Sequence, residues 1–277
     1  MSLSVPIHGN YHGYYLKRPS VVDPRLALLP ANTFAGKRVL DIGCNEGRVT
    51  CEIAQAWGAH KVVGVDIDDT LIRAAWKRRQ LVWSLQKPQS LQSDGDDDSM
   101  EVDNSSLIRS EPIEVNHLQS DYFPAALQHS FGLLPIPPSR IRGKHVFPHN
   151  VSFRTADWTT EEIVEDADGY DVIVGFSISK WIHIHGGDDG LRAFFRRVYS
   201  VLKPGGIFIL EPQEWYTYKK AKRLHESLRN TARTLELRPS DFEAILEGIG
   251  FSSVSHIGIT GEGGFRRTVD LYVKQHT

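Results

Sequence analysis

The stretch of sequence that decides the fold of this chain is Val39-Leu40-Asp41-Ile42-Gly43-Cys44-Asn45-Glu46-Gly47. Its first four residues predict a buried parallel strand, a glycine-flanked turn follows, and the residues from Val49 to Trp57 predict a helix. A strand, a glycine-rich turn and a helix in this order open a nucleotide-binding βαβ unit. The next apolar run ends at Asp66, roughly where such folds place an acid for ribose hydroxyls.

The spacing of the glycines after the first strand separates two classes of ligand. A dinucleotide site follows the pattern G-x-G-x-x-G, in which missing side chains let the backbone approach a pyrophosphate. Here Asn45 stands where the second glycine belongs, and Arg48 stands where the third belongs. The turn therefore argues against a dinucleotide and favours an adenosyl ligand without phosphates, such as S-adenosylmethionine.

Length and composition are those of a globular α/β protein. The chain has 277 residues, of which 40% are hydrophobic, so it can form one sizeable domain over residues 1–277, although two small domains would also fit. The formal net charge of −2 excludes a global basic field of the kind that attracts nucleic acid. Basic residues nevertheless cluster locally, at 192–197, 219–223 and 266–267.

Cysteine content and hydropathy indicate a reducing, aqueous compartment. Cys44 and Cys51 lie in one turn-helix unit, where we expect no disulfide. The N-terminus lacks the charged-then-apolar layout of a signal peptide, and no apolar run approaches membrane-spanning length. We therefore expect a soluble intracellular protein, nuclear or cytosolic.

Further apolar runs continue the alternation of strands and helices. Five more strands are predicted, the last two as an antiparallel pair: 151–155, 170–177, 207–210, 253–260 and 268–274. A helix is predicted to begin at Asp189, after a polar stretch at 178–183. The predicted fold is one doubly wound α/β sheet of seven strands, mostly parallel, with an antiparallel terminal hairpin and helices on both faces.

Two segments fall outside this alternation. Residues 1–35 carry three tyrosines beside basic residues, which suggests an arm or lid over a site; the alternative is an extension that packs its aromatics on the domain. Residues 86–147 are rich in Ser, Gln, Asp and Pro, and they cannot bury enough apolar surface to offset their ordering entropy. We predict a disordered surface insertion there, with a short helix at 121–129 as an option.

Polar motifs follow the predicted strands at the points where the strands end. Because ligands of doubly wound sheets bind beyond the carboxyl ends of the strands, these motifs are expected to share one rim. They are Gly43–Gly47, Asp66, Asp157-Trp158, Ser177–Lys180 and Glu211–Trp215. Five separate pieces on one rim support a single ligand site more strongly than any one of them does.

Three motifs resemble those of the class I S-adenosylmethionine-dependent methyltransferases, which have a Rossmann-like fold: Leu-Asp-Ile-Gly-Cys-Asn-x-Gly at 40–47, Val-Asp-Ile-Asp at 65–68 and Leu-Lys-Pro-Gly-Gly at 202–206. More narrowly, the chain resembles the methylphosphate capping enzymes, the bicoid-interacting group of RNA methyltransferases. That resemblance spans nearly the whole chain except the insertion. It rests on Gly9-Asn10-Tyr11 with Tyr14-Tyr15, Arg25-Leu26, Asp41–Asn45, Ser177–His183, Gly187–Leu191 and Glu211-Pro212-Gln213-x-Trp215.

The resemblance implies an RNA 5′-phosphate methyltransferase. Members of that family transfer a methyl group from S-adenosyl-L-methionine to the γ-phosphate of the 5′ triphosphate of a small non-coding RNA, and S-adenosyl-L-homocysteine is the product. The 7SK RNA is the best-known target, and small nuclear RNAs made by RNA polymerase III are the wider class. Members remain on their RNA together with La-related proteins. A monomer in the nucleus is implied, with the cytoplasm as a second location and no role for a membrane.

The resemblance also assigns cofactor contacts to particular residues. Asp157-Trp158 stands where the family usually has Asn-Tyr, and His185-Gly186 stands where it usually has Asn and Trp. The residues implied to bind the cofactor are Tyr14, Arg25, Gly43, Cys44, Asn45, Gly47, Asp66, Ile67, Asp157, Trp158 and Ile178.

Methyl transfer to a terminal phosphate makes few chemical demands on a protein. Such a phosphate loses its last proton at about pH 6, so the nucleophile needs no general base, and alignment supplies most of the catalysis. No catalytic acid or base is therefore assigned. The residues expected to hold the RNA are Arg18, Lys180, Trp181, His183, Glu211, Gln213, Trp215, Lys219, Lys220, Arg223 and Arg266. For each cation the alternative is a solvated surface charge.

Three other interpretations were weighed. His183 and His185 with Asp188 suggest a metal, but H-x-H in a loop without a nearby third ligand is weak support, and no metal is predicted. The acceptor could instead be a 5′-monophosphate RNA, a small molecule or a protein. The chain could also be a largely structural subunit of an RNA-protein particle that keeps an intact cofactor pocket.

Overall fold

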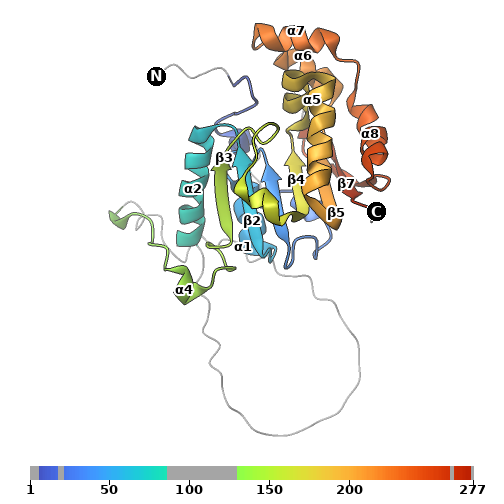
Figure 1. The fold of residues 1–277 in the computed structure, drawn as a ribbon. Coiled ribbons are helices and arrows are strands. Elements are labelled where there is room, and N and C mark those ends of the chain that lie inside the picture. Colours follow the sequence, from blue (N-terminus) through green and yellow to red (C-terminus); the bar gives the residue numbers. More distant parts are fainter. Residues whose placement is uncertain (1–5, 18–21, 86–129, 263–264, 276–277) are drawn as a thin grey trace.

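The computed structural model of the protein describes residues 6–17, 22–85, 130–262 and 265–275, and these form one seven-stranded sheet (Figure 1). The strands lie in the order β3-β2-β1-β4-β5-β7-β6. Their bounds are β1 (Arg38–Ile42), β2 (Lys61–Asp66), β3 (Val151–Thr155), β4 (Tyr170–Phe176), β5 (Leu202–Glu211), β6 (Ser255–Thr260) and β7 (Arg267–Val273). Strands β1 to β5 are parallel, and β7 is antiparallel to both β5 and β6. The predicted sheet is therefore confirmed.

The helices cover both faces of the sheet. They are α1 (Arg48–Ala56), α2 (Asp69–Ser84), α4 (Ser139–Arg142), α5 (Ser179–Val201), α6 (Tyr218–Ala221), α7 (Glu226–Thr234) and α8 (Phe242–Ile249). Alternate residues of β1 point to opposite cores: Val39 packs with α1 and α2, whereas Leu40 packs with α5 and α8. Within the described ranges, no helix has the length and apolar character needed to cross a membrane.

The two helices of the first half begin where the sequence places polar or glycine residues. Gly47 caps α1 with a φ of +71°, and a Cβ there would lie 2.8 Å from Ala75 and Phe153. Glycine is required at this position by packing as well as by conformation. Asp68 caps α2, and its side chain accepts from the backbone N–H of Thr70 at 2.8 Å.

The expected start of the long helix at Asp189 is wrong. Helix α5 begins at Ser179, ten residues earlier, and continues across a break at Gly187, where φ is +68° and ψ is −170°. The first part of α5 is only about two turns long and carries polar residues, so its periodicity is too short to separate from a loop. Trp181 and Ile184 from this part are buried against α6 and α7 in a third apolar cluster.

The end of the predicted insertion is structured. Within residues 130–147, Leu134 donates its backbone N–H to Ser84 at 2.9 Å, and Trp83 donates its indole N–H to Pro135 at 3.1 Å. These bonds join α2 to the segment that carries α4. The expectation of disorder over 86–147 therefore does not hold for its last eighteen residues, while residues 86–129, with the optional helix at 121–129, lie outside the described ranges.

Candidate functional site: a cavity beyond the carboxyl ends of the strands

The turn after β1 uses backbone conformations that favour glycine and asparagine. Gly43 has a φ of +71° and Asn45 a φ of +51°. The backbone N–H groups of Gly43 and Cys44 both donate to the carbonyl of Val65, at 2.8 and 3.0 Å, which fixes the turn to β2. A Cβ on Gly43 would lie 2.2 Å from the Cγ2 of Ile178. The glycine therefore lets the segment after β4 close against the turn.

Asp66 ends β2 and holds two turns in place. Its Oδ2 accepts from the backbone N–H of Asn45 at 2.9 Å, and its Oδ1 accepts from that of Asp68 at 3.0 Å. Burial raises the pKa of Asp66, and these backbone hydrogen bonds oppose the rise because they stabilise the carboxylate. Each carboxylate oxygen can accept a further hydrogen bond, so Asp66 can hold ribose hydroxyls and the turn together.

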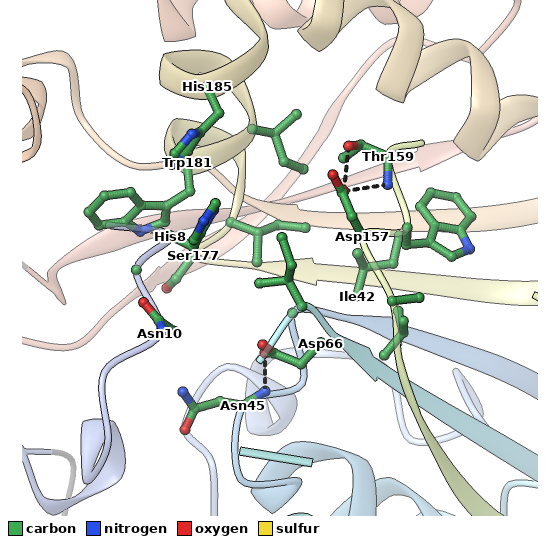
Figure 2. Close-up of a pocket in the computed structure, with 18 of the residues that line it drawn as sticks. His8, Asn10, Ile42, Asn45, Asp66, Asp157, Thr159, Ser177, Trp181 and His185 are labelled. Atoms are coloured by element: carbon green, nitrogen blue, oxygen red, sulfur yellow. Dashed lines mark hydrogen bonds between the residues drawn. The ribbon is translucent and has the colours of Figure 1, made fainter. Parts of the chain in front are cut away.

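A cavity of about 450 Å³ opens where the order of the strands reverses, between β1 and β4. Figure 2 shows Asp66 and Asn45 at one end, Asp157 and Thr159 on one side, and His8 and Trp181 on the other. Its volume is in the range of small-molecule sites. The predicted site residues that line it are Tyr14, Gly43, Asn45, Asp66, Ile67, Asp157, Trp158, Ile178 and Trp181.

The lining of the cavity fits S-adenosylmethionine. The side-chain oxygens of Asn10 and Asn45 are buried and have no hydrogen-bond partner among the described residues, although both residues line the cavity. Buried polar atoms without partners are costly, so a ligand that carries hydrogen-bond donors is favoured there. The ammonium and the ribose hydroxyls of the cofactor are such donors. Burial of Trp158 and Ile42 adds the apolar wall that an adenine ring needs.

The N-terminal segment 6–17 lies over this cavity. Gly9 approaches Trp181 so closely that a Cβ would be 2.1 Å from the indole nitrogen. The segment is attached through contacts at several points: Asn10 Nδ2 to Asp68 Oδ2 (2.6 Å), Gly13 N to Glu46 Oε1 (3.1 Å), Tyr14 OH with Ser177 Oγ (3.0 Å) and His185 Nε2 to Ile7 O (2.9 Å). The role of residues 1–35 as an arm or lid stays a prediction.

A lysine lies beside the cavity at its end near α5, next to Trp181 of the lining. Lys180 places its ammonium 4.7 Å from the centroid of the Trp181 ring, and that ammonium makes no hydrogen bond or ion pair with a described residue. Burial, together with repulsion from Arg267 and Lys220, lowers the pKa of Lys180 to about 8. Because burial and repulsion disfavour this ammonium, an anion that binds beside it would stabilise it.

A buried network carries Ser177, which follows β4 with a φ of +61°. Its hydroxyl donates to Glu211 and accepts from the Nη1 of Arg267 at 2.8 Å. Glu211 in turn pairs with Arg25 at 2.9 Å, and Arg25 pairs with Asp23 at 2.7 Å. The network therefore fixes the backbone at Ser177, which lines the cavity between the turn after β1 and α5.

Six predicted contact residues lie behind the cavity wall instead of lining it. Arg25 and Glu211 are 1% and 0% exposed, and they belong to the network around Ser177. Cys44 is buried in the core below the turn, and Gly47 makes room for the packing of Phe153. The structure therefore corrects the direct contacts predicted for these four residues, because their side chains or Cβ positions face the protein interior.

Gln213 and His183 are the other two corrections. The side-chain oxygen of Gln213 accepts from Ser179 Oγ and from the backbone N–H of Lys180, at 3.0 and 2.9 Å, which caps α5. His183 is fully buried between Tyr218 OH at 3.1 Å and Asp188 Oδ1 at 2.8 Å. Burial lowers the pKa of His183 although Asp188 opposes the shift. Both side chains hold α5 in place and are not available to RNA.

The remaining predicted RNA contacts lie outside the cavity lining. Trp215 stacks on Tyr218 with 4.5 Å between centroids and is covered by Arg238, whose guanidinium lies 4.0 Å from the ring centroid. Four of the cations are exposed: Lys219, Lys220, Arg223 and Arg266. Only Lys220 is coupled to Lys180 through its charge. Arg18 lies outside the described residues.

Sequence reasoning missed two functional positions. Arg267 belongs to β7, and only the antiparallel pairing of β7 with β5 brings its guanidinium to Ser177. His8 lines the cavity and stacks on His185, with 4.4 Å between the ring centroids, although the two residues are far apart in the sequence. No local pattern marks Arg267 as a partner of Ser177. The signal for His8 was its place next to Gly9-Asn10-Tyr11.

Comparison with known proteins agrees with this geometry. A family model described as Bicoid-interacting protein 3 (Bin3) matches residues 170–274, and one described as Methyltransferase domain matches residues 39–135. A TehB-like SAM-dependent methyltransferase from Corynebacterium glutamicum has the same fold, with a TM-score of 0.50 at 14% identity over 94% of this chain and 92% of that one. The fold and the cavity define a class I S-adenosylmethionine-dependent methyltransferase.

Relatives in sequence narrow this class. The U6 snRNA methylphosphate capping enzyme Amus of Drosophila melanogaster is 30% identical over 96% of this chain and 74% of its own length. The 7SK snRNA methylphosphate capping enzymes of mouse and human are 36% and 37% identical over 96% of this chain. This chain belongs to the family of the methylphosphate capping enzymes. It spans 40% and 39% of the mouse and human relatives.

Proposed function

We propose that this protein transfers a methyl group from S-adenosylmethionine to the terminal γ-phosphate at the 5′ end of a small non-coding RNA. The observation that carries the proposal is the environment of Lys180. Its ammonium is half-buried at the rim of the cofactor cavity, next to two other cations and without an anionic partner among the described residues. The terminal phosphate of a 5′ triphosphate supplies the missing negative charge.

The chemistry needs alignment more than proton transfer. The cofactor supplies an electrophilic methyl group on a sulfonium. A terminal phosphate loses its last proton at about pH 6, so its oxygen is already a nucleophile at neutral pH. In this proposal Lys180 orients that phosphate, and its charge offsets part of the repulsion within the triphosphate. Arg267 acts behind it by holding Ser177 of the cavity lining. No side chain of this chain has to remove a proton from the acceptor.

The rest of the RNA is held by the surface beyond the cavity. The first nucleotide can stack on the ring of Trp181 at the rim. This ring meets Tyr11 edge to face, with 6.0 Å between centroids, and lies under the ammonium of Lys180. Lys219, Lys220 and Arg223, on and just after α6, are exposed and can contact the following phosphates.

The names of the relatives support a nuclear substrate. Each of the three relatives above is named for a small nuclear RNA, 7SK or U6. We extend the proposal to a small nuclear RNA and to a nuclear location, which imaging of the tagged full-length protein tests. A monomeric state and a La-related partner protein stay predictions, and purification of the RNA-bound protein from its source tests both.

The test of the activity compares RNAs that differ only at the 5′ end. The full chain is incubated with labelled S-adenosylmethionine and matched RNAs that carry a triphosphate, a monophosphate or a hydroxyl. We expect label on the triphosphate RNA, released by removal of the γ-phosphate. Label on the hydroxyl-ended RNA would overturn phosphate capping, and label on the monophosphate RNA alone would move the acceptor to that end. Binding without label would favour a structural role in an RNA-protein particle.

A further inference from the structure

A second cavity, of about 440 Å³, lies at the opposite end of the sheet from the cofactor cavity. Arg38 and Lys61 are the first residues of β1 and β2, and His149 lies two residues before the start of β3. The segment with α4 forms the other wall, at the end of the sheet away from the N-terminal segment (Figure 1). The lining consists of Arg38, His60, Lys61, Ser139, Lys144, His145 and His149. Six of these seven residues are basic and none is acidic.

The two lysines of this cavity have no counter-charge of their own. Neither ammonium makes a hydrogen bond or an ion pair with a described residue. Burial lowers the pKa of Lys61, and repulsion from Arg38 adds to the shift. The nearby carboxylate of Glu165 is already bound by Arg154 at 2.8 Å. Glu165 attracts Lys61 and opposes the fall of its pKa, but the two side chains make no ion pair in the described fold.

The histidines give the cavity a flat polar wall. His60 and His145 stack with 3.8 Å between ring centroids and an angle of 17° between planes. His149 donates its Nε2–H to the carbonyl of Pro137 at 2.8 Å, which fixes the ring. In the ranges that the structure describes, no group of three His, Cys, Asp or Glu side chains is placed to hold a metal ion. The lining has the chemistry of an anion site.

We propose that this second cavity binds backbone phosphates of the same RNA whose 5′ end occupies the cofactor cavity. The inference rests on the proposed function, because RNA is the polyanion that this protein family acts on. Five residues of β1 separate the two ends of the sheet, which corresponds to about 16 Å. A small RNA that is held at its 5′ end is long enough to pass from one end of the sheet to the other.

A local site of this kind matters because the chain as a whole does not attract RNA. Its net charge is −2, so affinity beyond the first nucleotides has to come from places where cations gather. Each phosphate that a lysine neutralises in a single strand contributes a salt dependence of about 0.7 in log K against log salt. The second cavity is thus expected to raise affinity for long RNA without changing the chemistry at the 5′ end.

The experiment compares a long 5′-triphosphate RNA with one trimmed to its first few nucleotides, using the full chain. In Lys61→Gln/Lys144→Gln we expect the Kd of the long RNA to rise about tenfold and its salt slope to fall by about 1.4. Methylation of the short RNA should be unchanged. Lys77→Gln is the matched control, because Lys77 is an exposed lysine on α2 outside the lining. An effect of the double variant no larger than that of the control would overturn the proposal.

Lys61 lies within β2, so a folding defect has to be separated from a lost contact. Lys144 is exposed and outside any strand, and Lys144→Gln alone should lower the salt slope by about 0.7 while leaving thermal unfolding unchanged. An unchanged slope in this variant would also overturn the proposal. Thermal unfolding of each variant is measured beside the binding assay.

Two further arms identify the ligand. Inorganic tripolyphosphate should shift the imidazole NMR signals of His60 and His145 in the parent protein and not in the double variant. Displacement of the long RNA by a poly-glutamate peptide as effectively as by unlabelled RNA would overturn the assignment to RNA phosphates. The proposed function fails separately: if no RNA is methylated but long-RNA binding still depends on Lys144, the second site stands and the capping activity does not.

Discussion

The two ends of the cofactor cavity bury charge in opposite ways. At the cofactor end, burial raises the pKa of Asp66, but two backbone N–H groups already stabilise its carboxylate. At the end near α5, burial and neighbouring cations lower the pKa of Lys180 to about 8, and no anion among the described residues offsets its charge. The Asp66 carboxylate is stabilised by groups of the protein itself, whereas the Lys180 ammonium gains an anionic partner only when a ligand binds. This difference supports the proposal that the cofactor binds at one end and an anionic acceptor beside the other.

The largest expected effect comes from breaking the contact between the two ends. In Gly43→Ala the new Cβ would lie 2.2 Å from Ile178, and a non-glycine residue at a φ of +71° costs about 1–2 kcal/mol. With overpacking added, we expect the free energy of unfolding to fall by about 2–5 kcal/mol and S-adenosylhomocysteine binding to be lost. Chemical denaturation and titration calorimetry measure the two effects.

Gly36→Ala is the control for this prediction. Gly36 has a φ of +68°, but nothing lies within 4 Å of its added Cβ. It should therefore show only the backbone cost, about 1–2 kcal/mol, with cofactor affinity unchanged. Equal losses in both variants would mean that the close approach of Ile178 to the turn is not what closes the cofactor end.

The second effect tests the charge at the acceptor end. Lys180→Gln should lower kcat/KM for the triphosphate RNA by about 100-fold, or about 2.7 kcal/mol, since it removes the cation that faces the phosphate. Cofactor affinity should be unchanged because Lys180 is not among the residues that line the cofactor cavity. A loss of cofactor affinity in this variant would contradict the division of the cavity into two ends.

The pH dependence gives an independent measure of the same charge. Because the pKa of Lys180 is about 8, its ammonium loses a proton as the pH rises through that value, and KM for RNA should rise above pH 8. The terminal phosphate does not contribute, since it is already ionised above about pH 6. Lys180→Arg keeps its charge and should have a flat KM over the same range. A rise of equal size in Lys180→Arg would assign the titration to another group.

The third effect tests the cofactor end of the cavity, where Asp66 accepts from two backbone N–H groups. Asp66→Ala removes the acceptor of two backbone N–H groups, and each unpaired group costs about 1–3 kcal/mol when buried. We therefore expect both weaker cofactor binding, by about tenfold or more, and a lower free energy of unfolding. Asp66→Asn, which retains one oxygen, should lose less stability. A fold as stable as the parent in Asp66→Ala would show that the turn does not depend on this carboxylate.

The smallest effect tests how far the acceptor end extends. Trp215 is outside the cavity lining and packs on Tyr218 and Arg238. Trp215→Ala should cost about 1–2 kcal/mol of stability, less than the ~3–5 kcal/mol of a fully buried tryptophan, and change RNA methylation by only a few-fold. Trp181→Ala, at the rim, should reduce methylation more. The reverse order in an RNA methylation assay would move the nucleotide contact to Trp215.

The sequence predicted most of the sheet because each strand is a short apolar run with a polar residue at its end. The bounds of β3 were predicted as found, and Asp66, Asp157 and Ser177 were placed on one rim. The start of α5 was missed because a short polar helix before a glycine break has no readable period. The directions of two side chains were also missed. His183 and Gln213 are polar and lie near the rim in sequence, which suggested exposure, but they point inward to cap and hold α5.

The sequence by itself predicted the ligand class and the succession of strands and helices along the chain, since both follow from local features. Glycine at 43 with asparagine at 45 sets the turn, and alternating apolar runs set the strands. Only the tertiary structure decided which charges meet. Arg267 reaches Ser177 through the pairing of β7 with β5, and Lys61 joins Lys144 through the return of the segment before β3. The physical reason is that electrostatic interaction depends on distance in space and on burial, and neither quantity is encoded by neighbouring residues along the chain.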